Sequence, residues 1–337
     1  MKEESFKTKE ISLAEFEGIR IGHASDEEAA TGCTVLIAEE GMAAAVDIRG
    51  GGPASRESAL LEPLASTEMI HAIVLSGGSA FGLEAGCGAA KFLEEKGVGF
   101  ETGYAKVPLI CQSCIYDLGI GRADVRPDLQ MGYLACQDAY ERDQRTAMGN
   151  VGAGTGATVG KAMGAERMMK SGLGSYAVQA GELKVGALVV VNALGDIYDS
   201  KTHEKIAGMR NAKGEGFEDG EQALLSGIAQ QEGDNLFTAN TTIGIVICNA
   251  DLNKMQLKRV ASASHNGYAR TIRPVHTSAD GDSIYAAAVG SSRINANVDM
   301  VSLLAVHAME NAVNRAVLSA KSLHGVPAAE DILQRIK

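Results

Sequence analysis

The sequence has no tryptophan, and aromatic residues occupy only 4% of its 337 positions. It also has no apolar run near the length of about 20 residues that a membrane helix needs, since the longest, around 185–191, is far shorter. Basic residues are in the minority, with 31 against 42 acidic ones and a net charge of −11. So acidic a chain, with so few stacking side chains, does not suit a phosphate backbone. We therefore expect neither nucleic acid nor a membrane among its partners.

Features of exported proteins are also missing from the sequence. The first residues, MKEESFKTKEISLAEF, contain no apolar segment of the secretory kind. The six cysteines suit a reducing compartment, where buried thiols stay free. Cys111 and Cys114 have C-x-x-C spacing, but no second pair and no helix start accompany them, which argues against redox or metal chemistry. These features predict a cytoplasmic protein.

Motifs of cofactor enzymes are present only in fragments. The stretch GAGTGATVGK (152–161) resembles a phosphate-binding loop, but Thr155 stands where the motif needs glycine and Ala162 where it needs serine or threonine. A zinc-binding H-E-x-x-H pattern begins at position 203, but Ala207 replaces its second histidine. The histidines show no ligand-like spacing, and His276, near acidic residues, is interpreted as structural in preference to polar lining of a site. We therefore expect no nucleotide, metal or other cofactor.

Short apolar segments alternate with helical patterns along the chain. We expect strands at 33–37, 43–48, 72–75, 187–191, 242–248 and 284–289. We expect helices at 80–95, 133–147, 220–229, 252–269 and 300–320. This alternation predicts a layered α/β domain whose strands are buried between helices.

One polar, glycine-rich stretch interrupts the pattern. Residues 207–240 include KGEGFEDGEQ and QQEGDN, a composition typical of an exposed connection. The stretch ends at Asn240, where we expect an accessible peptide bond, and a strand follows from Thr241 or Thr242. A loop that enters a strand at threonine is by itself ordinary. It nevertheless marks the only internal boundary that composition suggests.

Several polar side chains elsewhere have both an ordinary and a chemical interpretation. Asp280 and Asp282 flank one glycine, which is typical of a turn but also offers paired carboxylates that can orient an amine. Asn192 ends an apolar segment, where it either forms a turn or donates its amide to an oxyanion. Lys161 and Tyr116, taken singly, are equally consistent with surface positions. These residues alone leave the choice open.

Seven segments taken together form a far more specific pattern. They are RGGGPASRE (49–57), HAIVLSGGSAFGLEA (71–85), YDLGIG (116–121), GNVGAGTGATVGK (149–161), VGALVVVNALGDI (185–197), NTTIGIVICNA (240–250) and RPVHTSADGDSIYA (273–286). In this order, over nearly the whole chain, they resemble the L-aminopeptidase/D-esterase family of self-processing peptidases, which includes β-aminopeptidases and nylon-oligomer hydrolases. The resemblance implies an α/β fold, a layered α-β-β-α sandwich, and an N-terminal-nucleophile hydrolase.

The resemblance also implies a cleavage site. The family cleaves itself before the residue that becomes the nucleophile, and the matching bond joins Asn240 to Thr241. A single catalytic domain, 1–337, would thus become an α subunit of 1–240 and a β subunit of 241–337. The freed α-amino group, which titrates at about 7.7–8.0, can then accept the proton of the Thr241 hydroxyl.

The family's other site residues match five positions. Its acidic pair matches Asp280 and Asp282, which would hold the new amine and hydroxyl. Its oxyanion asparagine matches Asn192, its lysine Lys161 and its tyrosine Tyr116. The implied activity is that of an aminopeptidase or amidase which releases N-terminal amino acids from small peptides, amides or esters. The implied assembly is a homo-oligomer of α/β pairs.

Three alternatives to this activity remain at this point. The first is hydrolysis of amide oligomers of the nylon type, and the second is transfer of the acyl group to an amine, as ornithine acetyltransferases of the same fold do. A catalytically silent binding protein is the third alternative. One stretch also departs from the family: VPLICQSC (107–114) carries Cys111, Gln112 and Cys114 where relatives are more apolar. Since it adjoins Tyr116, we expect it to line the substrate pocket.

Overall fold

The fold contains two packed β-sheets, and one long strand, β3 (Thr31–Ile48), belongs to both of them. The structure is a computed structural model that describes residues 8–229 and 240–336. The first half of β3 pairs with β2 (Arg20–Asp26) and β5 (Ile70–Ser76), and its second half pairs with β17 (Ser283–Ala288). The two strands expected at 33–37 and 43–48 are therefore one. Its register with β5 shifts between Ile37 and Met42, where Gly41 has a φ of +82°.

The remaining strands extend the sheets on both sides of β3. The order is β1-β11-β12-β15-β17-β3-β5-β8-β4, with β2 beside β3. The bounds are β1 Lys9–Ile11, β4 Ala54–Arg56, β8 Ile110–Cys114, β11 Leu173–Ala180, β12 Leu183–Asn192 and β15 Thr241–Cys248. Most neighbours are antiparallel, but β15 runs parallel to β17 and β5 parallel to β8.

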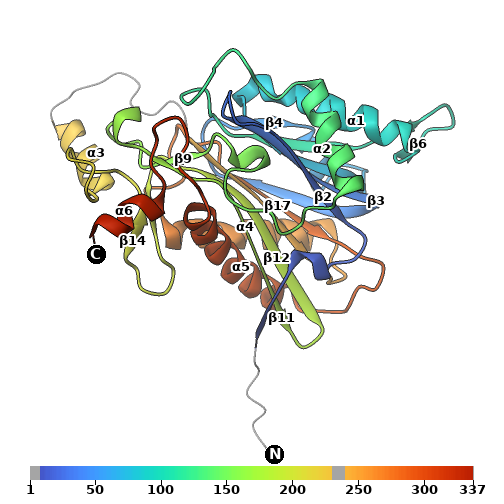
Figure 1. Cartoon of the computed structure of the whole chain (residues 1–337). Coiled ribbons are helices and arrows are strands. Elements are labelled where there is room, and N and C mark those ends of the chain that lie inside the picture. Colours follow the sequence, from blue (N-terminus) through green and yellow to red (C-terminus); the bar gives the residue numbers. More distant parts are fainter. Residues whose placement is uncertain (1–7, 230–239, 337) are drawn as a thin grey trace, which may run out of the picture.

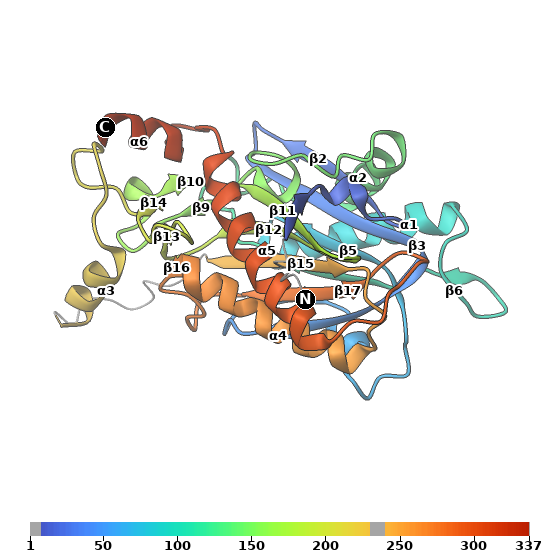
Figure 2. The same ribbon diagram turned by 90° about the horizontal axis from the view of Figure 1, so that it is seen from below.

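Helices cover the outer face of each sheet (Figures 1 and 2). The helices α4 (Lys254–Thr271) and α5 (Val298–Leu318) lie on the sheet of β11, β12 and β15, whereas α1 (Ala85–Glu95) and α2 (Leu129–Glu141) lie on that of β2, β3 and β5. The expected α-β-β-α sandwich is thereby confirmed. The helix expected at 133–147 begins earlier, because the Asp128 side chain accepts the Met131 N–H and caps it.

Along each buried strand, successive side chains alternate between two hydrophobic cores. In β12, Val189 and Val191 pack toward α4 and α5, whereas Leu188 and Val190 pack between the two sheets. Successive strand residues point to opposite faces, so a strand buried on both sides must be apolar throughout. This is why the segment around 185–191 is the longest apolar run of the sequence.

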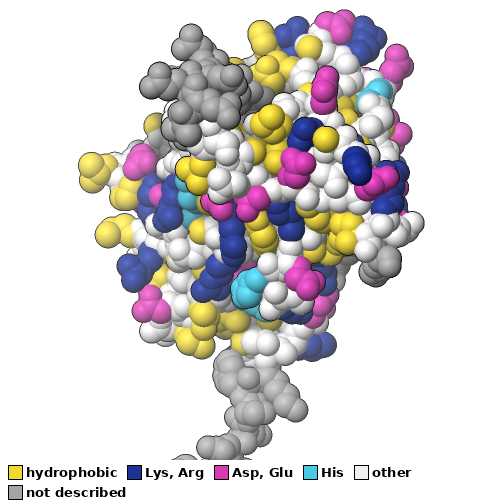
Figure 3. Space-filling model, turned by 90° about the vertical axis from the view of Figure 1, so that its left-hand side faces the viewer, with side chains coloured by type: hydrophobic (Ala, Val, Ile, Leu, Met, Phe, Trp, Pro, Cys, Tyr) yellow, Lys and Arg dark blue, Asp and Glu magenta, His cyan; other side chains and the backbone are white. Residues whose placement is uncertain are grey.

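Smaller elements surround the sandwich. They are α3 (Gly220–Ala229), α6 (Ala329–Ile336), and the short strands β6 (Phe100–Glu101), β7 (Lys106–Val107), β9 (Thr158–Val159), β10 (Met169–Lys170), β13 (Asp196–Tyr198), β14 (Lys205–Ala207) and β16 (Ile272–Arg273). Part of the polar stretch at 207–240 is thus the helix α3, and its residues 230–239 lie outside the described residues. Within the described part of the chain, no helix is long and apolar enough to cross a membrane. On the face seen in Figure 3, acidic and basic side chains are interspersed.

Candidate active site

Strand register places the candidate residues at one end of the larger sheet. The end of β12 lies against the start of β15, so that Asn192 is paired with Thr241. On the other side of β15, Asn240 forms a parallel bridge with Asp280, just before β17. Residues from three distant parts of the sequence thus meet around the Asn240–Thr241 bond.

The bond itself is buried. Asn240 and Thr241 retain 3% and 4% of their accessible surface. The Thr241 hydroxyl contacts the carbonyl oxygen of Asn240, and the Gly281 N–H donates to the same hydroxyl oxygen at 3.2 Å. The expectation of an accessible bond was wrong, because strands flank both sides of this position.

Asp282 lies beside the start of β15 and is almost completely buried. Its Oδ1 accepts the Thr242 N–H at 2.6 Å. Its Oδ2 accepts the backbone N–H of His276 at 3.1 Å and lies 2.8 Å from the same residue's Nδ1. Both oxygens of Asp282 are therefore held by hydrogen bonds. One of these bonds comes from Thr242, the residue directly after the candidate nucleophile.

The second carboxylate, Asp280, has a different environment. Its Oδ2 accepts hydrogen bonds from Thr277, from the backbone N–H at 2.7 Å and the hydroxyl at 2.6 Å. Burial, followed by the nearby charge of Asp282, raises the pKa of Asp280 to about 6, although Thr277 and Lys161 oppose the shift. A buried carboxylic acid whose pKa is raised toward neutrality is typical of sites that move protons near neutral pH.

Lys161 and Asn192 form the opposite side of the site. The Lys161 ammonium donates to Asn192 Oδ1 at 2.8 Å and to its backbone oxygen at 3.2 Å. The Thr158 N–H donates to the same Oδ1 at 3.0 Å, and Asn192 Nδ2 donates to the Tyr116 carbonyl at 2.9 Å. Burial lowers the pKa of Lys161 to about 7, against the opposing attraction of Asp280 and Asp117. The amide is thus fixed in orientation by its neighbours on both ends.

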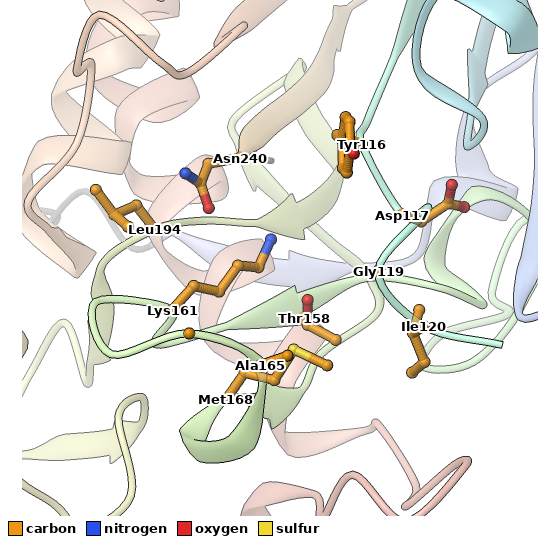
Figure 4. Close-up of a pocket in the computed structure, with 11 residues that line it drawn as sticks. Tyr116, Asp117, Gly119, Ile120, Thr158, Lys161, Ala165, Met168, Leu194 and Asn240 are labelled. Carbon is orange, nitrogen blue, oxygen red and sulfur yellow. The ribbon is translucent and has the colours of Figure 1, made fainter. Parts of the chain in front are cut away.

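A cavity of about 280 Å³ adjoins this side of the site (Figure 4). Its polar end is formed by Thr158, Lys161, Tyr116 and Asn240. Ile120, Ala165 and Met168 line the cavity on the side away from Asn240, whereas Leu194 lies beside Asn240 and Lys161 (Figure 4). Asp117 also lines it, but Gly78 N–H and the Thr31 hydroxyl, each at 2.7 Å, engage the two oxygens of its carboxylate.

The cysteine-containing stretch does not reach this cavity. Cys111, Gln112 and Cys114 are buried in β8 and are not among the described residues that line it, so the expectation that they line the pocket was wrong. Gln112 instead donates to Ser76 and to the Gly82 carbonyl. Burial raises the pKa of both thiols to about 12, which keeps them protonated and unreactive.

The glycine-rich loop at 152–161 supports the site from behind. Lys170 is completely buried, and its ammonium donates to the carbonyls of Gly154 and Ala157 at 3.1 and 3.0 Å. These bonds fix the loop that delivers Thr158 and Lys161. Within the described residues, no group of three or more His, Cys, Asp or Glu side chains is placed to hold a metal ion.

The sequence alone did not reveal several of these contacts. Thr158 and Lys170 were not singled out, because their partners lie 34 and 16 residues away in the sequence. Thr277 was also missed, although its partner Asp280 is only three residues further along the chain. His276 was interpreted as structural, although its position six residues before Asp282 was the one available signal. Gly281 was seen only as the spacer between two carboxylates.

Comparison with known proteins identifies the family of the chain. The model of peptidase family S58 matches residues 12–330, almost the entire described chain. The chain belongs to peptidase family S58. An uncharacterized aminopeptidase of Mycobacterium leprae is 37% identical over 94% of this chain and 92% of its own length. A 6-aminohexanoate-oligomer endohydrolase of Kocuria sp. is 29% identical over 88% of this chain and 83% of its own length.

A solved structure of another protein has the same fold as this S58 peptidase. The L-aminopeptidase D-Ala-esterase/amidase of Ochrobactrum anthropi, described as a variant of the Ntn hydrolase fold, superposes with a TM-score of 0.69. The two chains are 16% identical, with 96% of this one and 93% of the other covered. Family and fold together identify the protein as a hydrolase of the aminopeptidase and amide-hydrolase kind.

Proposed function

We propose that the chain cleaves its own Asn240–Thr241 bond and then works as an aminopeptidase or amidase with Thr241 as the N-terminal nucleophile. The observation that carries the proposal is the contact between the Thr241 hydroxyl and the Asn240 carbonyl inside a buried bond. An external protease needs an exposed, extended segment, which this bond does not offer. Cleavage here has to come from groups within the fold.

Maturation requires only the groups around Thr241. Its Oγ attacks the Asn240 carbonyl carbon, an ester forms, and the peptide C–N bond breaks as the nitrogen takes up a proton. Water then hydrolyses the ester, which leaves Asn240 as a carboxylate and Thr241 with a free amine and hydroxyl. The Gly281 N–H, 3.2 Å from the hydroxyl oxygen, helps to hold the attacking group in place.

Turnover uses the new amine as the base. It accepts the hydroxyl proton as Oγ attacks a substrate carbonyl, and it returns that proton to the leaving amine. Water then hydrolyses the acyl-enzyme ester. Asp280 and Asp282 orient the ammonium and hydroxyl of Thr241, whereas Asn192 and the charge of Lys161 stabilise the oxyanion. Tyr116 lines the same cavity and would contact a substrate bound there.

The cavity favours an acyl group with an uncharged, aliphatic side chain. Asn240 supplies the acyl group of the maturation step, and it also lines the cavity. An external substrate therefore places its acyl side chain in the same space, toward the apolar side chains of Ile120 and Met168. Hydrolysis of amide oligomers is the second candidate activity, because a relative named for 6-aminohexanoate oligomers covers most of the chain. A linear aliphatic acyl group of that kind also suits these apolar side chains.

The two products of cleavage should stay together. β15 begins at the new N-terminus but pairs with β12 along its full length, from Val185–Cys248 to Asn192–Thr241. Residues on both sides of the cleavage point also share the core under α4 and α5. We therefore propose a stable α/β pair, which assembles further into a homo-oligomer.

Substitution of two neighbouring threonines tests the proposed nucleophile. Thr241→Val should abolish both maturation and hydrolysis of aminoacyl p-nitroanilides, whereas Thr241→Ser should retain part of each. Thr242→Val is the matched control, since it changes the next residue of the same strand and should mature and turn over substrate. Full activity of Thr241→Val would refute the proposal. Loss of activity in Thr242→Val alone would move the nucleophile to that residue.

A further inference from the structure

His276 holds Asp282 in an unusual way. Its backbone N–H and its ring Nδ1 both approach Asp282 Oδ2, at 3.1 and 2.8 Å. The residue achieves this with a φ of +60°, in the left-handed region that side-chain-bearing residues seldom adopt. A carboxylate only accepts hydrogen bonds, so Nδ1 carries the proton and donates it. One residue thus supplies two donors to one carboxylate oxygen.

The His276 ring is fixed by its surroundings. It packs edge-on against His265, with ring centroids 4.8 Å apart, and lies 6.2 Å from the ring of Tyr268. The Nε2 atom makes no hydrogen bond to any described residue, and it is buried. The polar contacts of this side chain are therefore directed to Asp282, and aromatic neighbours prevent the ring from turning away.

The other oxygen of Asp282 connects this arrangement to the nucleophile. Oδ1 accepts the Thr242 N–H at 2.6 Å, directly after Thr241. If the carboxylate rotates, it releases the backbone at the start of β15. A displacement of the nucleophile by a fraction of an ångström is enough to slow a reaction that depends on alignment.

We propose that His276 is a positioning residue of the hydrolase, which fixes the Asp282 carboxylate so that it can align Thr241 for maturation and turnover. The inference rests on the proposed function, because it takes Thr241 as the nucleophile. His276 touches neither the substrate nor the reacting atoms in this scheme. Its contribution is the orientation of one carboxylate.

Three substitutions separate the donor from other properties of the residue. Asparagine tolerates the left-handed backbone and places an amide nitrogen as many bonds from Cα as Nδ1, so His276→Asn should keep most activity. In His276→Asp the side chain has the shape of asparagine but brings a second negative charge close to Asp282. His276→Gln moves its amide one bond further out. The aspartate and glutamine variants should lower kcat about 10- to 100-fold and slow maturation alike, since a hydrogen bond to a charged group is lost.

The control is His203, which is exposed and has the same φ of +60°. His203→Asp should leave kcat, KM and maturation unchanged. In the His276 variants kcat should fall while KM changes little, because the substrate cavity is lined by other residues. Melting temperatures, measured in parallel, show whether a lost fold explains the loss of rate.

The outcomes distinguish this inference from the proposed function. If Thr241→Val is inactive and His276→Asp works at the wild-type rate, the positioning role is refuted while the nucleophile stands. If Asn and Asp at position 276 are equally impaired, the hydrogen-bond donor is not what matters, and the inference also fails. Activity in Thr241→Val would refute the proposed function itself.

Discussion

Gly281 lies so close to the nucleophile that a single added methyl group should slow the enzyme. A Cβ atom at this position would lie 3.0 Å from Thr241 Oγ1, 2.9 Å from the Gly52 carbonyl oxygen and 3.1 Å from Pro53 Cα. Ordinary contacts of Cβ atoms begin at 3.4 Å, so the added group is about 0.4 Å too close to the hydroxyl. In Gly281→Ala either the threonine or the glycine loop at 50–52 must move.

The expected loss of rate follows from that displacement. A misplacement of about 1 Å can cost about 100-fold in rate, so a shift of about 0.4 Å should cost about tenfold, or about 1.4 kcal/mol of transition-state stabilisation. Because the same hydroxyl performs both reactions, maturation and turnover should slow together. Stability should fall less, since the site is at the end of the sheet rather than in its core.

Gly52→Ala is the matched control for this substitution. A Cβ atom there would have its nearest neighbour, the Asp280 carbonyl oxygen, at 3.8 Å, which is an ordinary contact. The assay is kcat for an aminoacyl p-nitroanilide, with the rate of maturation followed on denaturing gels and the melting temperature recorded. If Gly281→Ala matures and turns over substrate as fast as Gly52→Ala, the hydroxyl of Thr241 is not aligned by this contact and the assignment is wrong.

Three further predictions concern the acids, the cavity and the lysine. Asp280→Asn and Asp282→Asn should each lower kcat about 100-fold and slow maturation with little change in melting temperature. The reason is that catalysis needs the negative charge, whereas a turn would tolerate asparagine. Wild-type rates in both variants would show that the pair is structural. Met168→Ala should enlarge the apolar side of the cavity and raise kcat/KM for phenylalanyl relative to leucyl p-nitroanilide several-fold. The substitution Met163→Ala, at an exposed position, should leave this ratio unchanged. The same ratio in both variants would place the acyl group elsewhere. Burial lowers the pKa of Lys161 to about 7, so its charge is present below that pH and lost above it. The ratio of the wild-type kcat to that of Lys161→Met should therefore be larger at pH 6 than at pH 8.5. A constant ratio across that range would show that the charge contributes nothing.

Most of the sandwich was predictable because its strands and helices are marked by strong local patterns. The helix at 220–229 and the strand around 242–248 correspond closely to α3 and β15. The errors have local causes. Glu39 and Glu40 interrupt the apolar pattern of β3 and suggested a break, but both are exposed while the backbone continues through a bulge. The strand β11, which carries Tyr176 and Gln179 between small residues, has too weak a pattern to predict.

The site was predictable only to the extent that it coincides with sequence motifs. Thr241, Asp280 and Asp282 belong to segments that resemble a family, and strand register then brings them together. The support of Asp282 by His276 depends on a left-handed backbone and on aromatic packing, neither of which leaves a pattern in sequence. The burial of the Asn240–Thr241 bond was mispredicted because the polar composition of the preceding stretch suggested exposure.

The most direct test of the account is a time course of denaturing mass spectrometry on the purified chain at two protein concentrations tenfold apart. The account predicts that the intact mass of 35.1 kDa gives way to pieces of about 25 and about 10 kDa, the smaller beginning Thr-Thr-Ile-Gly. The rate should be the same at both concentrations, because the attacking hydroxyl and the Asn240 carbonyl belong to one molecule. An active enzyme that keeps its intact mass, or a new N-terminus other than Thr241, would contradict the account.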